Sequence, residues 1–265
     1  MVDGQKELFA GTTGIEARTV YEGVGEGGDR TLEIDRQAED LVFAELETLH
    51  EAGAEFTAIS EERGEVTFGD GSSPWRVVID PIDGSLNARR TIPSHSLSLA
   101  VASGSSLADV EFGFVYDFGA REEFAAARHR GAWLNEQPLE ARGPGYGLEL
   151  VALEASKPEL ISPIIDALAG KAYRIRSVGS LAISLAWVAA GRVDGLVCAR
   201  QARSVDIAAA QLIAREAGAV VKFDPYELDG AGLDLDARYD TVAALDEELL
   251  GTLLEVRRGT AAPQA

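Results

Sequence analysis

An apolar run ends abruptly in two aspartates within Trp75-Arg76-Val77-Val78-Ile79-Asp80-Pro81-Ile82-Asp83-Gly84-Ser85-Leu86-Asn87. Residues 77–79 are β-branched and show no polar alternation, which predicts a buried strand. Because proline has no N–H to donate, we expect the ladder to stop at Pro81, with Asp80 and Asp83 on the turn that leaves the sheet. The carboxyl end of a buried strand is where open α/β sheets bind their ligands.

This turn carries a combination of groups that suits phosphate chemistry. The carboxylates of Asp80 and Asp83 repel each other and lose water, so a positive charge is expected beside them. A hard divalent cation is the simplest candidate, because carboxylate oxygens are its preferred ligands. Gly84 permits close approach of another backbone, and the N–H groups of Gly84 and Ser85 are placed to face an anion. The alternative is an Asp-rich turn that only caps a helix.

The eight residues Asp80-Pro81-Ile82-Asp83-Gly84-Ser85-Leu86-Asn87 resemble a known signature, Asp-Pro-Ile/Leu-Asp-Gly-Ser/Thr-x-Asn. That signature belongs to the inositol monophosphatase and fructose-1,6-bisphosphatase superfamily. The resemblance implies an α/β (α+β) fold, the five-layered αβαβα sandwich of the sugar phosphatases. It also implies a lithium-sensitive phosphatase that uses about two to three Mg²⁺ ions per active site and that forms a homodimer.

Further blocks resemble the same superfamily in the order in which it carries them. Residues 28–40 contain Gly-Asp-x-Thr, then Asp35, then Glu-Asp, and they match the archaeal branch. By that match Asp35 helps to activate a water; the alternative is a first-turn carboxylate of the helix that begins there. Glu61-Glu62 follows a short strand, as the superfamily's metal-binding Glu-Glu pair does.

The second half of the chain carries two more of these blocks. Ser177-Val178-Gly179-Ser180 resembles the segment whose backbone lines the substrate site. Asp206-Ile207-Ala208-Ala209 resembles the superfamily's Asp-x-Ala-Ala, in which the aspartate binds a metal; ordinary helix capping is the alternative. Ala199 stands where some inositol monophosphatases carry a substrate-contacting Glu. The Arg203-x-x-Asp206 pattern instead resembles archaeal enzymes that hydrolyse both inositol phosphates and fructose 1,6-bisphosphate.

The resemblance therefore implies a complete set of site residues. The metal ligands are Glu61, Asp80, Asp83, Asp206 and the carbonyl of Ile82. The catalytic residues are Asp35 and Ser85, which orient the attacking water, and Glu62, which contacts a third, weaker ion or its water. The substrate-binding residues are Gly84, Ser85, Asn87, Gly179, Ser180 and Arg203.

The length of 265 residues fits one large domain or two fused halves. The Gly143-Pro144-Gly145-Tyr146-Gly147 run predicts a boundary, with residues 1–145 and 146–265 as the two halves of one compact catalytic unit. Periodicity predicts helices over residues 6–10, 34–49, 158–169, 181–190, 206–217 and 247–256. It predicts strands over residues 56–60, 77–79, 96–102, 110–116, 122–128, 132–135, 148–152, 174–176, 194–198 and 241–244. The polar, Gly-rich residues 63–74 are expected to form a loop.

The composition excludes several classes of function. Acidic residues number 44 against 24 basic ones, a formal net charge of −20, so nucleic-acid binding is not expected. No apolar run is long enough to span a membrane, and the N-terminus lacks a signal-peptide profile. The single Cys198 fits a reducing cytoplasm. The spacing of the histidines does not suggest a zinc site.

The charge itself has two interpretations. One is an acidic surface that binds a partner. The favoured one is adaptation to very high salt, where the Debye length falls to about 3 Å at 1 M and self-repulsion is screened. The composition resembles that of proteins from extremely halophilic archaea.

Two competing functions remain compatible with these residues. One is a nucleotide phosphatase acting on 3′-phosphoadenosine phosphate or NADP. The other is a non-catalytic homologue that binds an anion or a metal.

Overall fold

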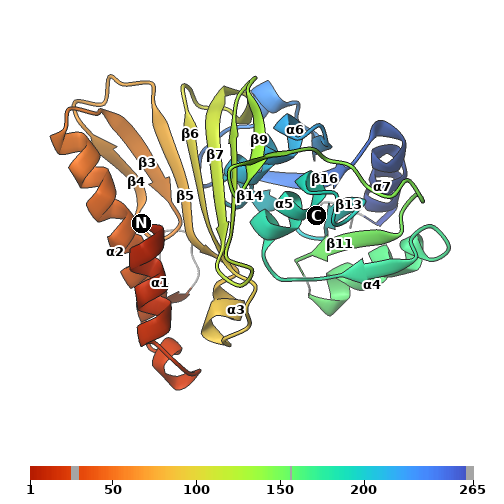
Figure 1. Cartoon of the computed structure of the whole chain (residues 1–265), viewed down its shortest axis with the longest axis horizontal. Helices are drawn as coiled ribbons and strands as arrows, with labels where there is room; N and C mark the ends of the chain where they lie inside the picture. The colour runs from red at the N-terminus through yellow and green to blue at the C-terminus, as the bar shows by residue number, and fades with distance from the viewer. Residues whose placement is uncertain (25–29, 156, 261–265) are drawn as a thin grey trace.

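The computed structural model describes residues 1–24, 30–155 and 157–260. Figure 1 shows alternating layers of helix and sheet, with α1 (Val2–Gly11) and α2 (Glu33–Glu51) at one end and α4 (Pro158–Leu168) and α7 (Glu247–Thr260) at the other. This arrangement confirms the predicted five-layered sandwich. The Gly28-Asp29 pair that opens the first resembling block lies outside the described residues. No helix in the described ranges combines the length and the apolar character needed to cross a membrane.

The first sheet has eight strands in the order β10-β9-β8-β7-β6-β5-β3-β4. Among the described strand pairs of this first sheet, only β3–β5 is parallel. A separate antiparallel pair, β1 (Tyr21–Val24) and β2 (Arg30–Leu32), precedes α2. The strands of the large sheet are β3 (Phe56–Ser60), β4 (Gly64–Phe68), β5 (Arg76–Asp83), β6 (Ser96–Ala102), β7 (Val110–Asp117), β8 (Glu122–Ala127), β9 (Gly131–Leu134) and β10 (Gln137–Leu139).

The second sheet has six strands, and β16 pairs with β13, β14 and β15. Its order along the main path is β12-β11-β13-β16-β14. The strands are β11 (Leu150–Glu154), β12 (Arg174–Arg176), β13 (Gly195–Cys198), β14 (Ala202–Arg203), β15 (Val220–Asp224) and β16 (Arg238–Ala244).

The middle layer is formed by α5 (Leu181–Ala189) and α6 (Ser204–Glu216). Nearly every residue of α5 is buried, and so are the first eleven residues of α6. Helices that are buried on nearly every side need cover all round, and the two sheets provide it. Thus α6 packs on β5 to β9 and on β15, while α5 reaches β11, β13 and β16.

The outer helices are amphipathic and cover one face each. Helix α2 (Glu33–Glu51) buries Ile34, Ala38, Val42 and Leu46, which recur at intervals of four residues along one side. It lies beside α1 (Val2–Gly11) over the first sheet. On the far side, α4 (Pro158–Leu168) packs against α7 (Glu247–Thr260), and α7 covers β13 and β16. The short helix α3 (Ser85–Arg89) and three single 3₁₀ turns complete the described elements.

Two predictions about the strands are wrong. β5 does not stop at Pro81 but runs to Asp83, pairing with β6 at Asp80–Ser98 and Asp83–Ser96 through an irregular register. Beyond Ile79, β5 has lost its other partner β3, so Pro81 interrupts no regular ladder there. Residues 63–74 are not wholly a loop, because β4 pairs antiparallel with β3.

Several predicted boundaries also differ from the structure. Helix α1 begins at Val2 rather than at Lys6, and β15 was not predicted at all. Helix α6 begins at Ser204, two residues before Asp206. The most consequential shift is in β11, which was predicted over residues 148–152 and in fact ends at Glu154.

His95 is buried in an aromatic cluster under α1. Its ring centroid lies 4.7 Å from that of Phe9 and 5.4 Å from that of Phe118. Burial lowers the pKa of His95 to about 4 from its ordinary 6.5, and the charge of Arg18 acts in the same direction. The neutral ring is therefore the form that the fold accepts.

We expect His95→Phe to flatten the acid limb of the stability curve. Because the folded pKa lies below the unfolded one, neutral His95 contributes stability that is present above pH 6.5 and is lost as the pH falls through 4. A shift of this size corresponds to about 3 kcal/mol. Urea unfolding gives the free energy of unfolding at about pH 7 and at about pH 4. The decrease in this free energy between the two pH values should be smaller by that amount in the variant than in the unmodified protein. Parallel losses would contradict the assignment.

Candidate active site

A cavity of about 430 Å³ lies where the ends of β5 and β11 meet the first turns of α3, α5 and α6. It brings together residues from both sheets that are far apart in the sequence. Its lining comprises Glu61, Asp80, Ile82, Asp83, Gly84, Ser85, Leu86, Asn87, Glu154, Ala155, Gly179, Leu181, Cys198, Arg200, Gln201, Ala202, Arg203 and Asp206. Most of the predicted metal and substrate residues are therefore gathered around one space.

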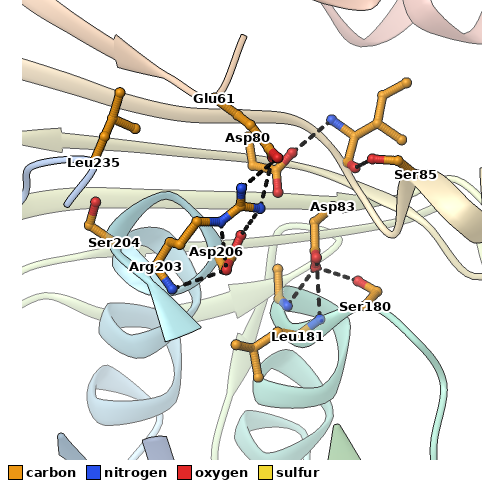
Figure 2. Close-up of polar contacts among 12 residues, drawn as sticks. Glu61, Asp80, Asp83, Ser85, Ser180, Leu181, Arg203, Ser204, Asp206 and Leu235 are labelled. Carbon is orange, nitrogen blue, oxygen red and sulfur yellow. Dashed lines mark hydrogen bonds and ion pairs between the residues drawn. The ribbon is translucent and has the colours of Figure 1, made fainter. Parts of the chain in front are cut away.

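Three carboxylates converge in this cavity. Oxygens of Glu61, Asp80 and Asp206 lie within 4.8 Å of one another. They come from the turn after β3, from β5 and from α6, as Figure 2 shows. Burial raises the pKa of Asp80 well above its usual value, and the charges of Glu61, Asp83 and Asp206 add to the effect. Burial also raises the pKa of Glu61.

This donor set fits a hard divalent cation. It consists of carboxylate oxygens held on three different elements, which cannot move apart without disturbing the fold. Mg²⁺ prefers such ligands and is retained by one or two carboxylates together with waters and substrate phosphate. A cation here would also relieve the repulsion that raises the pKa of Asp80.

Arg203 occupies the space between two of these carboxylates. Its Nη2 donates to Glu61 Oε2 at 2.8 Å and to Asp206 Oδ1 at 3.1 Å, while Nη1 donates to Glu61 Oε1. The side chain is only 14% exposed. Burial opposes its charge, but the carboxylates of Asp206 and Glu61 outweigh that cost and raise its pKa. The guanidinium is thus a built-in counter-charge for the predicted metal ligands, and its contact with substrate stays a prediction.

Asp83 has a different environment from the other aspartates. It accepts hydrogen bonds from Ser180 Oγ at 2.5 Å, Ala182 N at 2.7 Å and Leu181 N at 3.3 Å. Its carboxylate therefore caps the N-terminus of α5 (Figure 2). Burial and the charge of Asp206 raise its pKa to about 7. Among the described residues, the converging trio does not include Asp83, and its metal-binding role stays a prediction.

The turn after β5 is shaped by its glycine. Gly84 has φ +93° and precedes α3. A Cβ at this position would lie 3.0 Å from the Ser94 carbonyl oxygen and 3.1 Å from that of Gly179, so only glycine fits without displacing the backbone. The Ser85 hydroxyl donates to the Ile82 carbonyl at 3.0 Å, and the Ile82 N–H donates to Asp80 at 3.0 Å.

Asn87 and Ser180, like Ser85 and Arg203, are predicted substrate-binding residues whose side chains make hydrogen bonds within the protein. Asn87 donates to the carbonyl oxygens of Ser94 at 2.7 Å and Val178 at 2.6 Å. Ser180 accepts from Ile183 N while donating to Asp83. Gly179 has φ +79°, and a Cβ there would lie 2.8 Å from Asn87 Nδ2. These residues hold the backbone that borders the cavity.

Asp35 and Glu62 are predicted catalytic residues that are not among the described residues lining the cavity. Asp35 is buried in the first turn of α2, and Glu62 follows Glu61 in the turn after β3. The assignment of Asp35 to the attacking water, and that of Glu62 to a third, weaker ion or its water, stay predictions.

Sequence reasoning missed one buried carboxylate at the cavity. Glu154 is 2% exposed, ends β11 and lines the space beside Gly179. The signal was the same as for Asp80, a carboxylate that closes an apolar run, here Leu150-Val151-Ala152-Leu153. The predicted strand ended two residues early, so this signal was not recognised.

Comparisons with known proteins agree over nearly the whole chain. Residues 7–259 match the model of the inositol monophosphatase family. The chain is 36% identical over 244 residues to a fructose-1,6-bisphosphatase/inositol-1-monophosphatase of Methanothermobacter thermautotrophicus, covering 87% of this chain and 85% of that protein. A protein of the same name from Thermococcus kodakarensis is 31% identical over 237 residues, covering 89% and 86%. The fold resembles a solved inositol monophosphatase-fructose 1,6 bisphosphatase with a TM-score of 0.79 and 26% identity, covering 96% of this chain and 95% of the other.

Proposed function

The chain belongs to the inositol monophosphatase family, and on that premise we propose that it is a Mg²⁺-dependent phosphatase of small sugar and polyol phosphates. Its relatives are named phosphatases, which places it among the phosphoric monoester hydrolases. The proposed substrates are fructose 1,6-bisphosphate and inositol monophosphate. The observation that carries the proposal is the convergence of Glu61, Asp80 and Asp206 on one cavity.

The proposed mechanism assigns a task to each of the predicted metal-binding and catalytic residues. Glu61, Asp80 and Asp206 would hold the cation, together with Asp83 and the Ile82 carbonyl. When bound, the cation neutralises the phosphate and lowers the pKa of water. The N–H groups of Gly84 and Ser85 face the phosphate oxygens. Asp35 and the Ser85 hydroxyl orient the attacking water, with Glu62 supporting a weaker ion. Residues 1–145 and 146–265 act as two halves of this unit.

Phosphate release tests the proposal directly. We expect release from fructose 1,6-bisphosphate and from inositol monophosphate with Mg²⁺, loss of activity in excess EDTA, and inhibition by Li⁺. The same panel should include 3′-phosphoadenosine phosphate and NADP. Preference for those nucleotides would overturn the proposed substrate class, and full activity in EDTA would overturn the proposed metal dependence.

We expect the protein to be a homodimer in solution, because the family resemblance implies it. Light scattering at micromolar concentration should give twice the chain mass of 28.1 kDa. A mass equal to one chain in both low and high salt would contradict the prediction.

We propose that the protein is a cytoplasmic enzyme adapted to very high salt. High salt is therefore expected to stabilise it strongly. The net charge of −20 comes from the excess of carboxylates over basic side chains. The repulsion among these carboxylates weakens as the Debye length shrinks. The thermal midpoint should therefore rise markedly between about 0.1 M and about 2 M KCl. Equal midpoints would leave the acidic partner-binding surface as the better interpretation of the charge.

A further inference from the structure

Glu154 is a buried carboxylate at the cavity that the proposed mechanism does not use. Its Oε1 accepts from Val178 N at 2.9 Å and from Ser184 Oγ at 2.7 Å, and its Oε2 accepts from Gly179 N at 3.0 Å. Burial raises its pKa, and these three donors oppose the shift. In the described residues no cation is found within ion-pair distance of Glu154. Burying a carboxylate without a counter-ion costs several kcal/mol, so the residue is an expensive way to stabilise a fold alone.

The backbone that Glu154 holds is also held from α3 and from the loop that joins α3 to β6. The Val178 carbonyl accepts from Asn87 Nδ2 at 2.6 Å and from Ser94 Oγ at 3.1 Å. The N–H of Val178 therefore faces Glu154 at the end of β11, while its carbonyl faces the segment that follows β5. Immediately after this turn, Ser180 and the first amides of α5 are bonded to Asp83 (Figure 2). The turn of residues 178–179 is therefore hydrogen-bonded on both sides. It cannot shift without breaking either the bonds to Glu154 or those to Asn87 and Ser94.

This turn packs directly on the proposed phosphate-binding glycine. The Gly179 carbonyl oxygen lies so near Gly84 that a Cβ on Gly84 would approach it to 3.1 Å. Gly179 itself is in the left-handed region, with φ +79°, and touches Asn87. A displacement of the turn by a few tenths of an ångström therefore moves the backbone at Gly84 and Ser85. Contact runs without a gap from Glu154 through Gly179 to Gly84.

We propose that Glu154 is a positioning residue, which sets substrate affinity by holding the turn of residues 178–179 against Gly84. The inference rests on the proposed phosphatase function. The proposed role requires no contact between Glu154 and the substrate or the metal. Its negative charge orients the N–H groups of Val178 and Gly179 toward the end of β11, and the Gly179 carbonyl is left against Gly84. Loss of that orientation is felt in KM, because the groups that bind phosphate are displaced while the metal ligands stay in place.

The variant Glu154→Gln tests the inference. Glutamine keeps the size of the side chain, but its amide turns a donor toward Val178 N or Gly179 N, which are donors themselves. We expect KM to rise about tenfold, with kcat changed little and the Mg²⁺ concentration for half-maximal activity unchanged. Hydrogen exchange at residues 178 and 179 should be faster in the substrate-free variant.

Asp194→Asn is the matched control. Asp194 is another buried carboxylate beside the same sheet, accepting from Leu150 N at 2.8 Å, and it does not line the active cavity. We expect it to lower the thermal midpoint, as Glu154→Gln does, but to leave KM unchanged. Equal KM values in the two variants, with normal exchange at residues 178 and 179, would overturn the inference while leaving the proposed function intact. Absence of phosphate release in the unmodified protein would overturn both.

Discussion

Asp80→Asn is expected to reduce phosphate release by roughly a thousand-fold while making the metal-free protein more stable. Asp80 is 3% exposed and stands among the carboxylates of Glu61, Asp83 and Asp206. An amide removes the charge that this environment opposes, yet its oxygen can still accept the bond from Ile82 N. The catalytic loss follows because the cation, worth several kcal/mol in the transition state, loses a charged ligand.

Two measurements check this expectation together. Phosphate release is followed at saturating Mg²⁺, and thermal unfolding is followed in EDTA. Asp117→Asn serves as the control, because Asp117 is a buried aspartate of the same sheet whose pKa is also raised by burial. It accepts from the amides of Gly119 and Ala120, outside the cavity, and its substitution should leave activity near normal. Activity of Asp80→Asn within tenfold of the unmodified enzyme would remove Asp80 from the metal ligands.

Arg203→Ala is expected to destabilise the metal-free protein by about 3 to 5 kcal/mol, the usual effect of removing one partner from a buried ion pair. The substitution leaves Glu61 and Asp206 facing each other without the guanidinium that now joins them. Mg²⁺ should restore much of the loss, because a cation can take the place of the missing charge. Magnesium binding itself should become tighter, since Arg203 no longer competes for the same oxygens.

Urea unfolding with and without Mg²⁺, and calorimetric titration of Mg²⁺, measure these effects. Arg203→Lys is the control: it keeps a charge but loses the fork geometry, and its effect should be intermediate. The predicted contact of Arg203 with a second phosphate makes a separate demand. If this contact exists, Arg203→Ala should weaken the binding of fructose 1,6-bisphosphate by about 1.5 to 3 kcal/mol. The binding of inositol monophosphate should change little. Equal losses for both substrates would leave Arg203 with the metal ligands alone.

The sequence by itself was sufficient where a signal is local. The carboxylate that closes the apolar run at Asp80 could be recognised from the residues next to it, whereas Glu61 was assigned only through the superfamily resemblance. Helix α5 could be recognised from its continuous apolar character, α6 from Asp206 near its start and Gly218 after its end, and β6 from its alternation. The superfamily signature of residues 80–87 then implied the sandwich that the structure confirms.

The tertiary structure alone decided which of these groups meet and what each one holds. Arg203 and Glu61 are 142 residues apart, and Asp83 and Ser180 are 97 apart, so no local pattern relates them. Pro81 looked like the end of a strand, but β6 continues to pair with β5 beyond it through an irregular register. Glu154 acquires its role only because α5 and the 178–179 turn fold back over the end of β11. Burial and long-range pairing set the charge balance of a site, and both are properties of the packed chain rather than of any segment.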